Sequence, residues 1–317
     1  MEPPSSQPPP KPSEASEASA PSRSRAIFTF WARLFSTLIL WAVVLGTIFS
    51  GLEIGFFFVI GGLGMIALWE YFRMIENMGL PCFRVFGMVC GALSFCGSFF
   101  IFRTYGPGQA YDFELFVLLF FQLAVFGRQM FEKARVIASL QTIVTTVFGL
   151  FYVVWLFNFV TKIVYVIPSE DPDVRVTGHF YVLYLVAVTK FSDVGAYLIG
   201  SLIGKHPMVP NISPKKTWEG FFGALGLSTL ASVVLYALLP EQLGVFRWID
   251  VILLGPLLGF AAVAGDLAES IIKRSTAVKD SSRLLPGIGG SLDLIDSLLF
   301  TAPLLFLYLR LVLGVGV

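Results

Sequence analysis

A series of apolar runs, each near the length of a membrane-crossing helix, constrains this chain more than any other feature. A helix needs about 20 mainly apolar residues to cross the hydrocarbon core of a bilayer. A transmembrane barrel would instead show alternation of period two in short segments, and the runs show none. Of the 317 residues, 56% are hydrophobic and only 14% are charged, whereas a soluble domain has about a quarter charged. The sequence therefore predicts an all-α polytopic membrane protein.

About nine transmembrane helices are expected. The fourth run is short and the sixth carries charges, so eight or ten spans stay open as alternatives. The expected spans are roughly 31–49, 53–71, 85–102, 113–127, 138–160, 179–203, 219–239, 249–265 and 291–315.

Three regions follow from this pattern. Residues 1–26 are rich in Pro, Ser, Ala and Glu, a composition that cannot bury enough apolar surface to order itself, so we expect a disordered tail. It does not resemble a secretory signal, in which a short basic segment directly precedes the apolar core. Residues 27–178 would form N-terminal transmembrane helices, and residues 179–317 a C-terminal transmembrane region.

Basic residues indicate the orientation. Lys and Arg favour cytoplasmic loops, and the tail together with the even-numbered loops holds fifteen of them. The odd-numbered loops hold only Arg103, Lys162, Arg175 and Arg247. We therefore expect a multi-pass protein with a cytoplasmic N-terminus. The compact chain without organelle-targeting features favours a cell inner membrane. A net charge of +1 lacks the basic face of a nucleic-acid-binding protein.

The polar stretch 265–297 carries the strongest chemical signal. Asp266 and Glu269 are three residues apart, as are Asp293 and Asp296, so each pair lies on one face of its helix. Magnesium suits such acids, because it takes carboxylate oxygens together with substrate phosphates. Alternatively the acids only pair with the bases of a solvated loop, although this does not explain an Asp296 set within an apolar run. The bases between the two acid pairs are Lys273, Arg274, Lys279 and Arg283.

A second polar stretch lies upstream. Lys190 and Asp193 fall within an apolar helix, where ionisable side chains usually face a cavity or a partner; mutual pairing is the alternative. The segment before the seventh span is either an ordinary helix start capped by Thr217 or a phosphate site at a helix N-terminus. Spacing alone leaves both open. Its polar residues are Ser213, Lys215, Lys216, Thr217 and Glu219.

These two stretches resemble the phosphatidate cytidylyltransferases, also called CDP-diacylglycerol synthases. The long signature of that family reads Ser, Lys-Arg, Lys-Asp, Pro-Gly-His-Gly-Gly and Leu-Asp-Arg-x-Asp at fixed gaps. The chain departs from it at Ile288, where the family has histidine, and at Leu294, where it has arginine. The matching positions are Ser270, Lys273, Arg274, Lys279, Asp280, Pro286, Gly287, Gly289, Gly290, Asp293 and Asp296. The resemblance covers about residues 185–300, and it implies that 179–317 is the catalytic transmembrane region.

The resemblance implies that CTP and phosphatidate react to give CDP-diacylglycerol and pyrophosphate, in a polar cavity open to the cytoplasm and the inner leaflet. It implies one or two Mg²⁺ ions, held by Asp266, Asp293 and Asp296, with Asp193 and Glu269 as further ligands. Phosphates would be bound by Lys215, Lys216, Lys273, Arg274 and Lys279, with Ser213, Thr217 and Glu219 nearby.

Three alternatives remain. CTP-dependent kinases of polyprenols or phytol have a similar membrane core and transfer the γ-phosphoryl group instead. A second alternative is a non-enzymatic, ion-coupled transporter, which would usually show inverted repeats. We find no such repeats, because charged residues within the membrane are expected only in the last five spans. The third is a scaffold without activity. The oligomeric state, including a homodimer, stays open.

Overall fold

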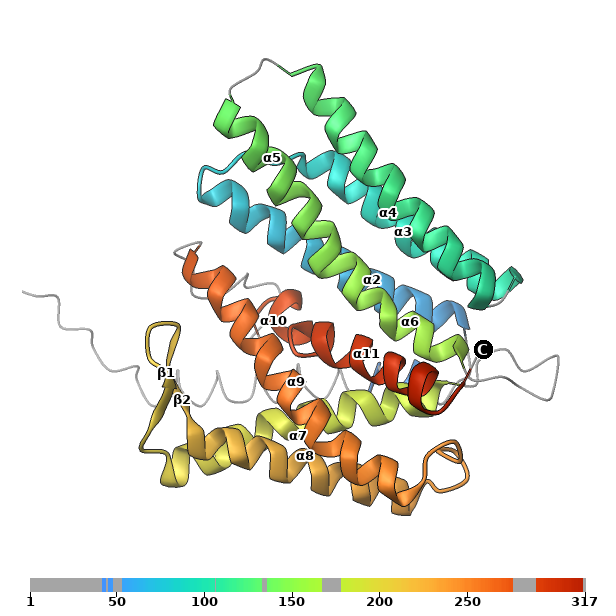
Figure 1. The fold of residues 1–317 in the computed structure, drawn as a ribbon, viewed down its shortest axis with the longest axis vertical. Coiled ribbons are helices and arrows are strands. Elements are labelled where there is room, and N and C mark those ends of the chain that lie inside the picture. Colours follow the sequence, from blue (N-terminus) through green and yellow to red (C-terminus); the bar gives the residue numbers. More distant parts are fainter. Residues whose placement is uncertain are drawn as a thin grey trace, which may run out of the picture.

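The computed structural model describes residues 42–43, 45–47, 53–105, 107–132, 136–166, 178–275 and 289–315. Within these ranges, eight helices are long and apolar enough to cross a membrane, and they make up most of the described part of the chain (Figure 1). The predicted all-α polytopic membrane fold is therefore confirmed. The tail 1–26 and most of the expected first span lie outside the described residues.

The N-terminal group consists of four spans that lie side by side (Figure 1). They are α2 (Glu53–Asn77), α3 (Arg84–Tyr105), α4 (Pro107–Met130) and a long fourth span. That last span runs through α5 (Val136–Gly149), the π-helical segment η1 (Leu150–Trp155) and α6 (Leu156–Val166). Small residues let these helices approach closely; a Cβ at Gly87, for example, would collide with the ring of Phe72.

The C-terminal group begins with α7 (His179–Ile203), followed by an antiparallel hairpin of β1 (Pro207–Val209) and β2 (Ser213–Thr217). It continues with α8 (Trp218–Leu238) and α9 (Trp248–Ser275). Glycines set the spacing here too, since a Cβ at Gly195 of α7 would collide with the carbonyl of Gly223 on α8. The three helices α7, α8 and α9 thus pack as one unit.

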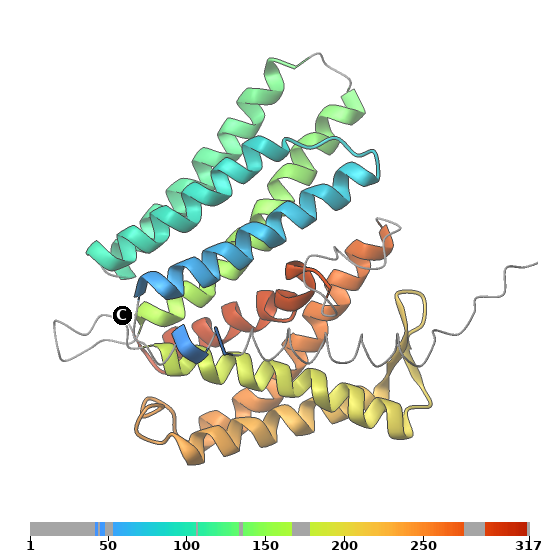
Figure 2. The ribbon, with the colours of Figure 1, turned by 180° about the vertical axis from the view of Figure 1, so that it is seen from behind.

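The last span joins the two groups. It consists of α10 (Ser291–Ile295), α11 (Leu298–Leu307) and the π-helical η2 (Tyr308–Val312). Figures 1 and 2 show α10 and α11 lying between the N-terminal helices and α9, with α10 against α2 and α11 against α6. The two regions divided at residue 178 therefore share a packed interior, and their separation as domains stays a prediction.

Two features differ from the expected spans. Helix α9 continues to Ser275, ten residues beyond its apolar run, because polar side chains end a hydrophobic run without ending helical hydrogen bonding. The last span is interrupted around Asp296 and Ser297, between α10 and α11. Asp266 and Glu269 therefore lie on α9 and Asp293 on α10, whereas Asp296 lies at the interruption itself.

A buried ion pair lies in the N-terminal group. Lys162 of α6 and Glu114 of α4 form a salt bridge, with side chains only 4% and 7% exposed. The Nδ2 atom of Asn158 donates to Glu114 Oε1 at 2.6 Å and to Ser98 Oγ at 2.9 Å. The Lys162 ammonium also lies 3.7 Å from the ring centre of Phe159. Intramembrane charge is therefore not confined to the last five spans, and that expectation was wrong.

Candidate active site

A polar cavity of about 500 Å³ lies between the hairpin, the helices α7, α8 and α9, and the interrupted start of the last span. Its size falls within the range of small-molecule sites, roughly 300–1,000 Å³. Polar side chains come from α7, the hairpin, α9, α10 and the break that follows α10. They are Asp193, Lys215, Lys216, Thr217, Asp266, Glu269, Lys273, Asp293, Asp296 and Ser297. Tyr197, Met208 and Phe221 supply an apolar part of the wall.

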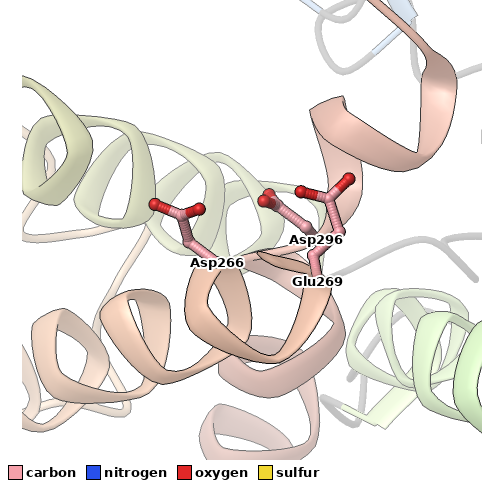
Figure 3. A group of neighbouring side chains, drawn as sticks. All are labelled: Asp266, Glu269 and Asp296. Atoms are coloured by element: carbon pink, nitrogen blue, oxygen red, sulfur yellow. The ribbon is translucent and has the colours of Figure 1, made fainter. Parts of the chain in front are cut away.

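Three carboxylates converge in this cavity (Figure 3). One oxygen from each of Asp266, Glu269 and Asp296 lies within 4.8 Å of the others. Glu269 and Asp296 are 2% and 6% exposed. Asp266 and Glu269 project from one face of α9 because they are three residues apart. The break after α10 can come this close because position 265 is glycine: a Cβ there would meet Ser297 Cα at 3.0 Å.

Asp296 is oriented by the interruption of the last span. Its Oδ1 accepts hydrogen bonds from the backbone N–H of Ser297 at 2.6 Å and from the Ser297 hydroxyl at 3.2 Å. Hydrogen bonds to a carboxylate are stronger than those between neutral groups. The interruption therefore fixes the direction of the carboxylate.

Lysines from the hairpin and from α9 face these acids. Lys216 Nζ lies 2.8 Å from Asp266 Oδ2. Lys273 Nζ lies 2.9 Å from Glu269 Oε2 and 2.6 Å from Asp293 Oδ1. Charges with little water around them are tolerated only when they are paired or coordinated. The lysines thus allow several acids to stand side by side, and they present positive charge to the cavity.

Lys190 and Asp193 pair with each other, as the simpler interpretation of that segment predicted. Their Nζ and Oδ2 atoms are 3.3 Å apart. Lys190 Nζ also donates to the carbonyl of Leu294 at 3.1 Å, next to the interruption of the last span. The pair therefore ties α7 to the helix that carries Asp293 and leads into Asp296, while Asp193 still lines the cavity.

The predicted metal ligands are only partly brought together. Asp266 and Asp296 share the three-carboxylate group with Glu269, whereas Asp193 and Asp293 line the same cavity outside that group. Asp293 Oδ2 accepts the backbone N–H of Gly290 at 2.9 Å, which caps α10. Three converging carboxylates form an all-oxygen donor set, and this chemistry fits Mg²⁺ better than a softer metal.

The predicted phosphate-binding residues also divide. Lys215, Lys216 and Thr217 line the cavity, but Ser213 and Glu219 do not. Thr217 caps α8, because its Oγ1 accepts the N–H of Gly220 at 3.2 Å; this part of the helix-start interpretation is confirmed.

Glu219 fastens the base of the hairpin. Its Oε1 lies 2.6 Å from His206 Nδ1, and its Oε2 accepts the backbone N–H of Lys205 at 3.2 Å. Arg274 Nε donates to the carbonyl of Ile212 at 3.1 Å, so it ties the end of α9 to the hairpin turn.

Lys279, a predicted phosphate-binding residue, and Ile288 lie outside the described residues.

Sequence reasoning missed one residue beside the site. Glu70 of α2 is fully buried, and its carboxylate oxygens accept the backbone N–H groups of Ser291 at 3.0 Å and Leu292 at 2.8 Å. An acid inside an apolar run was the available signal. Its partners could not be found, since they are backbone groups 221 and 222 residues away.

Comparison with known proteins supports the resemblance. The model of the cytidylyltransferase family matches residues 31–312. The chain is 43% identical over 134 residues to the phosphatidate cytidylyltransferase of Mycobacterium bovis, and the aligned segment covers 42% of each chain. It is 44% identical over 131 residues to that of Staphylococcus haemolyticus, covering 41% of this chain and 49% of the relative.

A further relative is the uncharacterized protein YnbB of Escherichia coli (strain K12), which is 38% identical over 167 residues, covering 53% of this chain and 51% of the relative. The chain thus spans about half the length of the curated relatives that it matches. The family model, in contrast, extends over nearly the whole chain, including every helix that forms the cavity. This protein therefore belongs to the cytidylyltransferase family.

Proposed function

We propose that this protein is a phosphatidate cytidylyltransferase, which makes CDP-diacylglycerol and pyrophosphate from CTP and phosphatidate. The observation that carries the proposal is the three-carboxylate group facing lysines inside one membrane-embedded cavity. Acids alone would suit a cation site, and lysines alone a phosphate site. Their combination suits a polyphosphate bound together with a divalent metal.

The lysines that line the cavity would hold the phosphates. Lys215 and Lys216 come from the hairpin and Lys273 from α9, so they approach the cavity from different sides. The hairpin is anchored at its base by Glu219 and at its turn by Arg274. This anchoring would keep Lys215 and Lys216 at a fixed distance from the acids of α9, which positions the α-phosphorus of CTP for attack.

Asp266, Glu269 and Asp296 are the residues that would hold Mg²⁺, with Asp193 and Asp293 at the rim of that site. Bound magnesium would neutralise charge on the transferred and leaving phosphate groups. The residues of the chain then orient the reactants, and catalysis of phosphoryl-type transfer depends mainly on such positioning and charge neutralisation.

The reaction joins an oxygen of the lipid phosphate to the α-phosphorus of CTP and breaks the bond from that phosphorus to the oxygen that bridges it to the β-phosphate. A phosphate monoester with a second pKa of about 6 is mostly ionised near pH 7. The attacking oxygen therefore needs no side chain to remove a proton. This is why the replacement of the family histidine by Ile288 is compatible with activity.

Phosphatidate would enter sideways from the cytoplasmic leaflet, with its acyl chains staying in lipid. The bias of Lys and Arg among the loops supports an orientation with the hairpin on the cytoplasmic side. On that orientation CTP reaches the cavity from the cytoplasm.

The test is to incubate purified protein in lipid micelles with Mg²⁺, phosphatidate and CTP labelled either at the α or at the γ phosphate. Label from the α position in the lipid product, with release of pyrophosphate, is the expected result. Transfer of γ label to an added polyprenol or phytol would replace the proposal with a lipid kinase. If no acceptor gains label in the presence of Mg²⁺, the protein is not an enzyme of either kind.

A further inference from the structure

Helix α10 is too short to hold its own position. It has five residues, Ser291–Ile295, and the first N–H groups of any helix have no partner within the helix. Its N-cap, Gly290, has no side chain to satisfy them. Yet α10 carries Asp293 and leads directly into Asp296, so any displacement of this helix would move two acids of the cavity.

Glu70 supplies the missing acceptors from the other half of the chain. Its two carboxylate oxygens accept the N–H groups of Ser291 and Leu292 at 3.0 and 2.8 Å. The Ser291 hydroxyl donates in turn to the carbonyl of Leu63 at 2.9 Å, also on α2. Glu70 has no exposed surface, so water cannot compete for these bonds. Hydrogen bonds to a charged acceptor are among the stronger ones in proteins.

We propose that Glu70 is a positioning residue of the active site: by capping α10 from α2, it holds Asp293 and Asp296 at the distance from α9 that metal binding and cytidylyl transfer require. This gives the N-terminal helices a direct part in the reaction. The inference rests on the proposed function for its kinetic consequence, but its structural consequence, the convergence of the acids, can be measured without turnover.

The first variant is Glu70→Gln, which keeps the size of the side chain but replaces one acceptor oxygen by an NH₂ group that faces a backbone N–H. The matched control is Glu76→Gln on the same helix, because the Glu76 carboxylate pairs at 2.8 Å with Arg84 and is 42% exposed. Both proteins are purified in detergent, and their folded fraction is checked by size exclusion and thermal unfolding.

Two readouts separate positioning from general folding. A misplacement of about 1 Å can cost about 100-fold in rate, so we expect kcat of folded Glu70→Gln to fall at least about tenfold. The KM for CTP should change much less, because the lysines of the hairpin and α9 remain in place. Binding of Mn²⁺ alone, followed by the loss of its free electron paramagnetic resonance signal, should weaken by a similar factor. Glu76→Gln should match the unchanged protein in both.

A second variant tests the hydrogen bonds themselves. Glu70→Met keeps a side chain of similar length in the same apolar surroundings but removes both acceptors of the Ser291 and Leu292 N–H groups. Ser291→Ala is the companion variant, because it removes only the hydroxyl bond to Leu63 and leaves both N–H groups in place. We expect kcat of folded Glu70→Met to fall at least as far as that of Glu70→Gln, and kcat of Ser291→Ala to fall much less.

Equal Mn²⁺ affinity in Glu70→Gln and the unchanged protein would overturn the proposal, as would the absence of Mn²⁺ binding in both. A kcat of folded Glu70→Met close to that of the unchanged protein would overturn the hydrogen-bond route. If the unchanged protein binds Mn²⁺ more tightly than Glu70→Gln but transfers no cytidylyl group, the positioning role holds and the proposed function fails.

Discussion

The buried pair of Glu114 and Lys162 gives a quantitative test of how the N-terminal helices hold together. The perturbation is Lys162→Met, which keeps a long apolar side chain against Phe159 but removes the ammonium. Glu114, only 7% exposed, then keeps the amide of Asn158 and loses its counter-charge. Removing one partner of a buried pair costs about 3–5 kcal/mol in soluble proteins, and a lone acid in a membrane helix costs about 2.5–3.5 kcal/mol on insertion scales.

We therefore expect Lys162→Met to lower the free energy of unfolding by about 3 kcal/mol, which is roughly a 100-fold change in the folding equilibrium. The double variant Glu114→Gln, Lys162→Met carries no charge at either position, and the carbonyl oxygen of the introduced amide can still accept from Asn158. Replacing a whole buried pair is often close to neutral, so the double variant should lose only about 1 kcal/mol.

The assay is reversible unfolding in mixed micelles with increasing sodium dodecyl sulfate, followed by circular dichroism. Arg128→Met is the control, because the Arg128–Glu132 pair at 3.9 Å is about half exposed and such pairs contribute under about 1 kcal/mol. A loss in Lys162→Met as small as in the control, or a double variant as unstable as the sum of its single variants, would refute the reasoning.

The remaining predictions concern the site and its surroundings. Asp296→Asn should abolish turnover in a folded protein, whereas Glu241→Gln, in the loop after α8, should leave it unchanged; near-normal activity of the first variant would remove Asp296 from the metal site. Lys216→Met should raise the KM for CTP about tenfold or more, because it removes a charge-assisted phosphate contact, and an unchanged KM in initial-rate kinetics would contradict this. A cysteine introduced at Lys205 should react with a membrane-impermeant maleimide only from the cytoplasmic side, and one at Glu241 only from the other side; the reverse pattern would invert the topology. Burial raises the pKa of Cys82, in the loop between α2 and α3, to about 11, so its thiol should react slowly at pH 8 and faster as the pH approaches 11, and a midpoint near pH 9 would contradict the burial.

The expected spans agree well with the described helices where apolar runs and helices coincide. The span 179–203 has the same bounds as α7, and 219–239 differs from α8 by one residue at each end. Hydropathy detects which residues leave water, and for these two helices the lipid boundary is also where the helix ends. For α9 the two boundaries are ten residues apart, so the expected span stopped short of Asp266 and Glu269.

The site could be predicted only in part. Fixed spacing along one helix was enough to place Asp266 and Glu269 on one face. The family resemblance then predicted that Asp296 binds metal together with them. The hairpin was not predicted, because its strands are three and five residues long and contain prolines and lysines without alternation. The contact of Glu70 with α10 depends on tertiary packing, and no local pattern in a single sequence records it.

The contact between Glu70 and Ser291 also has a consequence for biosynthesis. Its two ends are separated by 221 residues, and a ribosome adds roughly 5–20 residues per second. The Glu70 carboxylate therefore enters the membrane roughly 10–45 seconds before its partners are made, at a cost of about 2.5–3.5 kcal/mol while it lacks them. The early helices should accordingly remain a loose assembly during translation, open to chaperones and to membrane quality control. Insertion of the last helix both completes the active site and locks the first helices in place, so a nascent chain cut short before Ser291 should be degraded rather than persist as an inactive fragment.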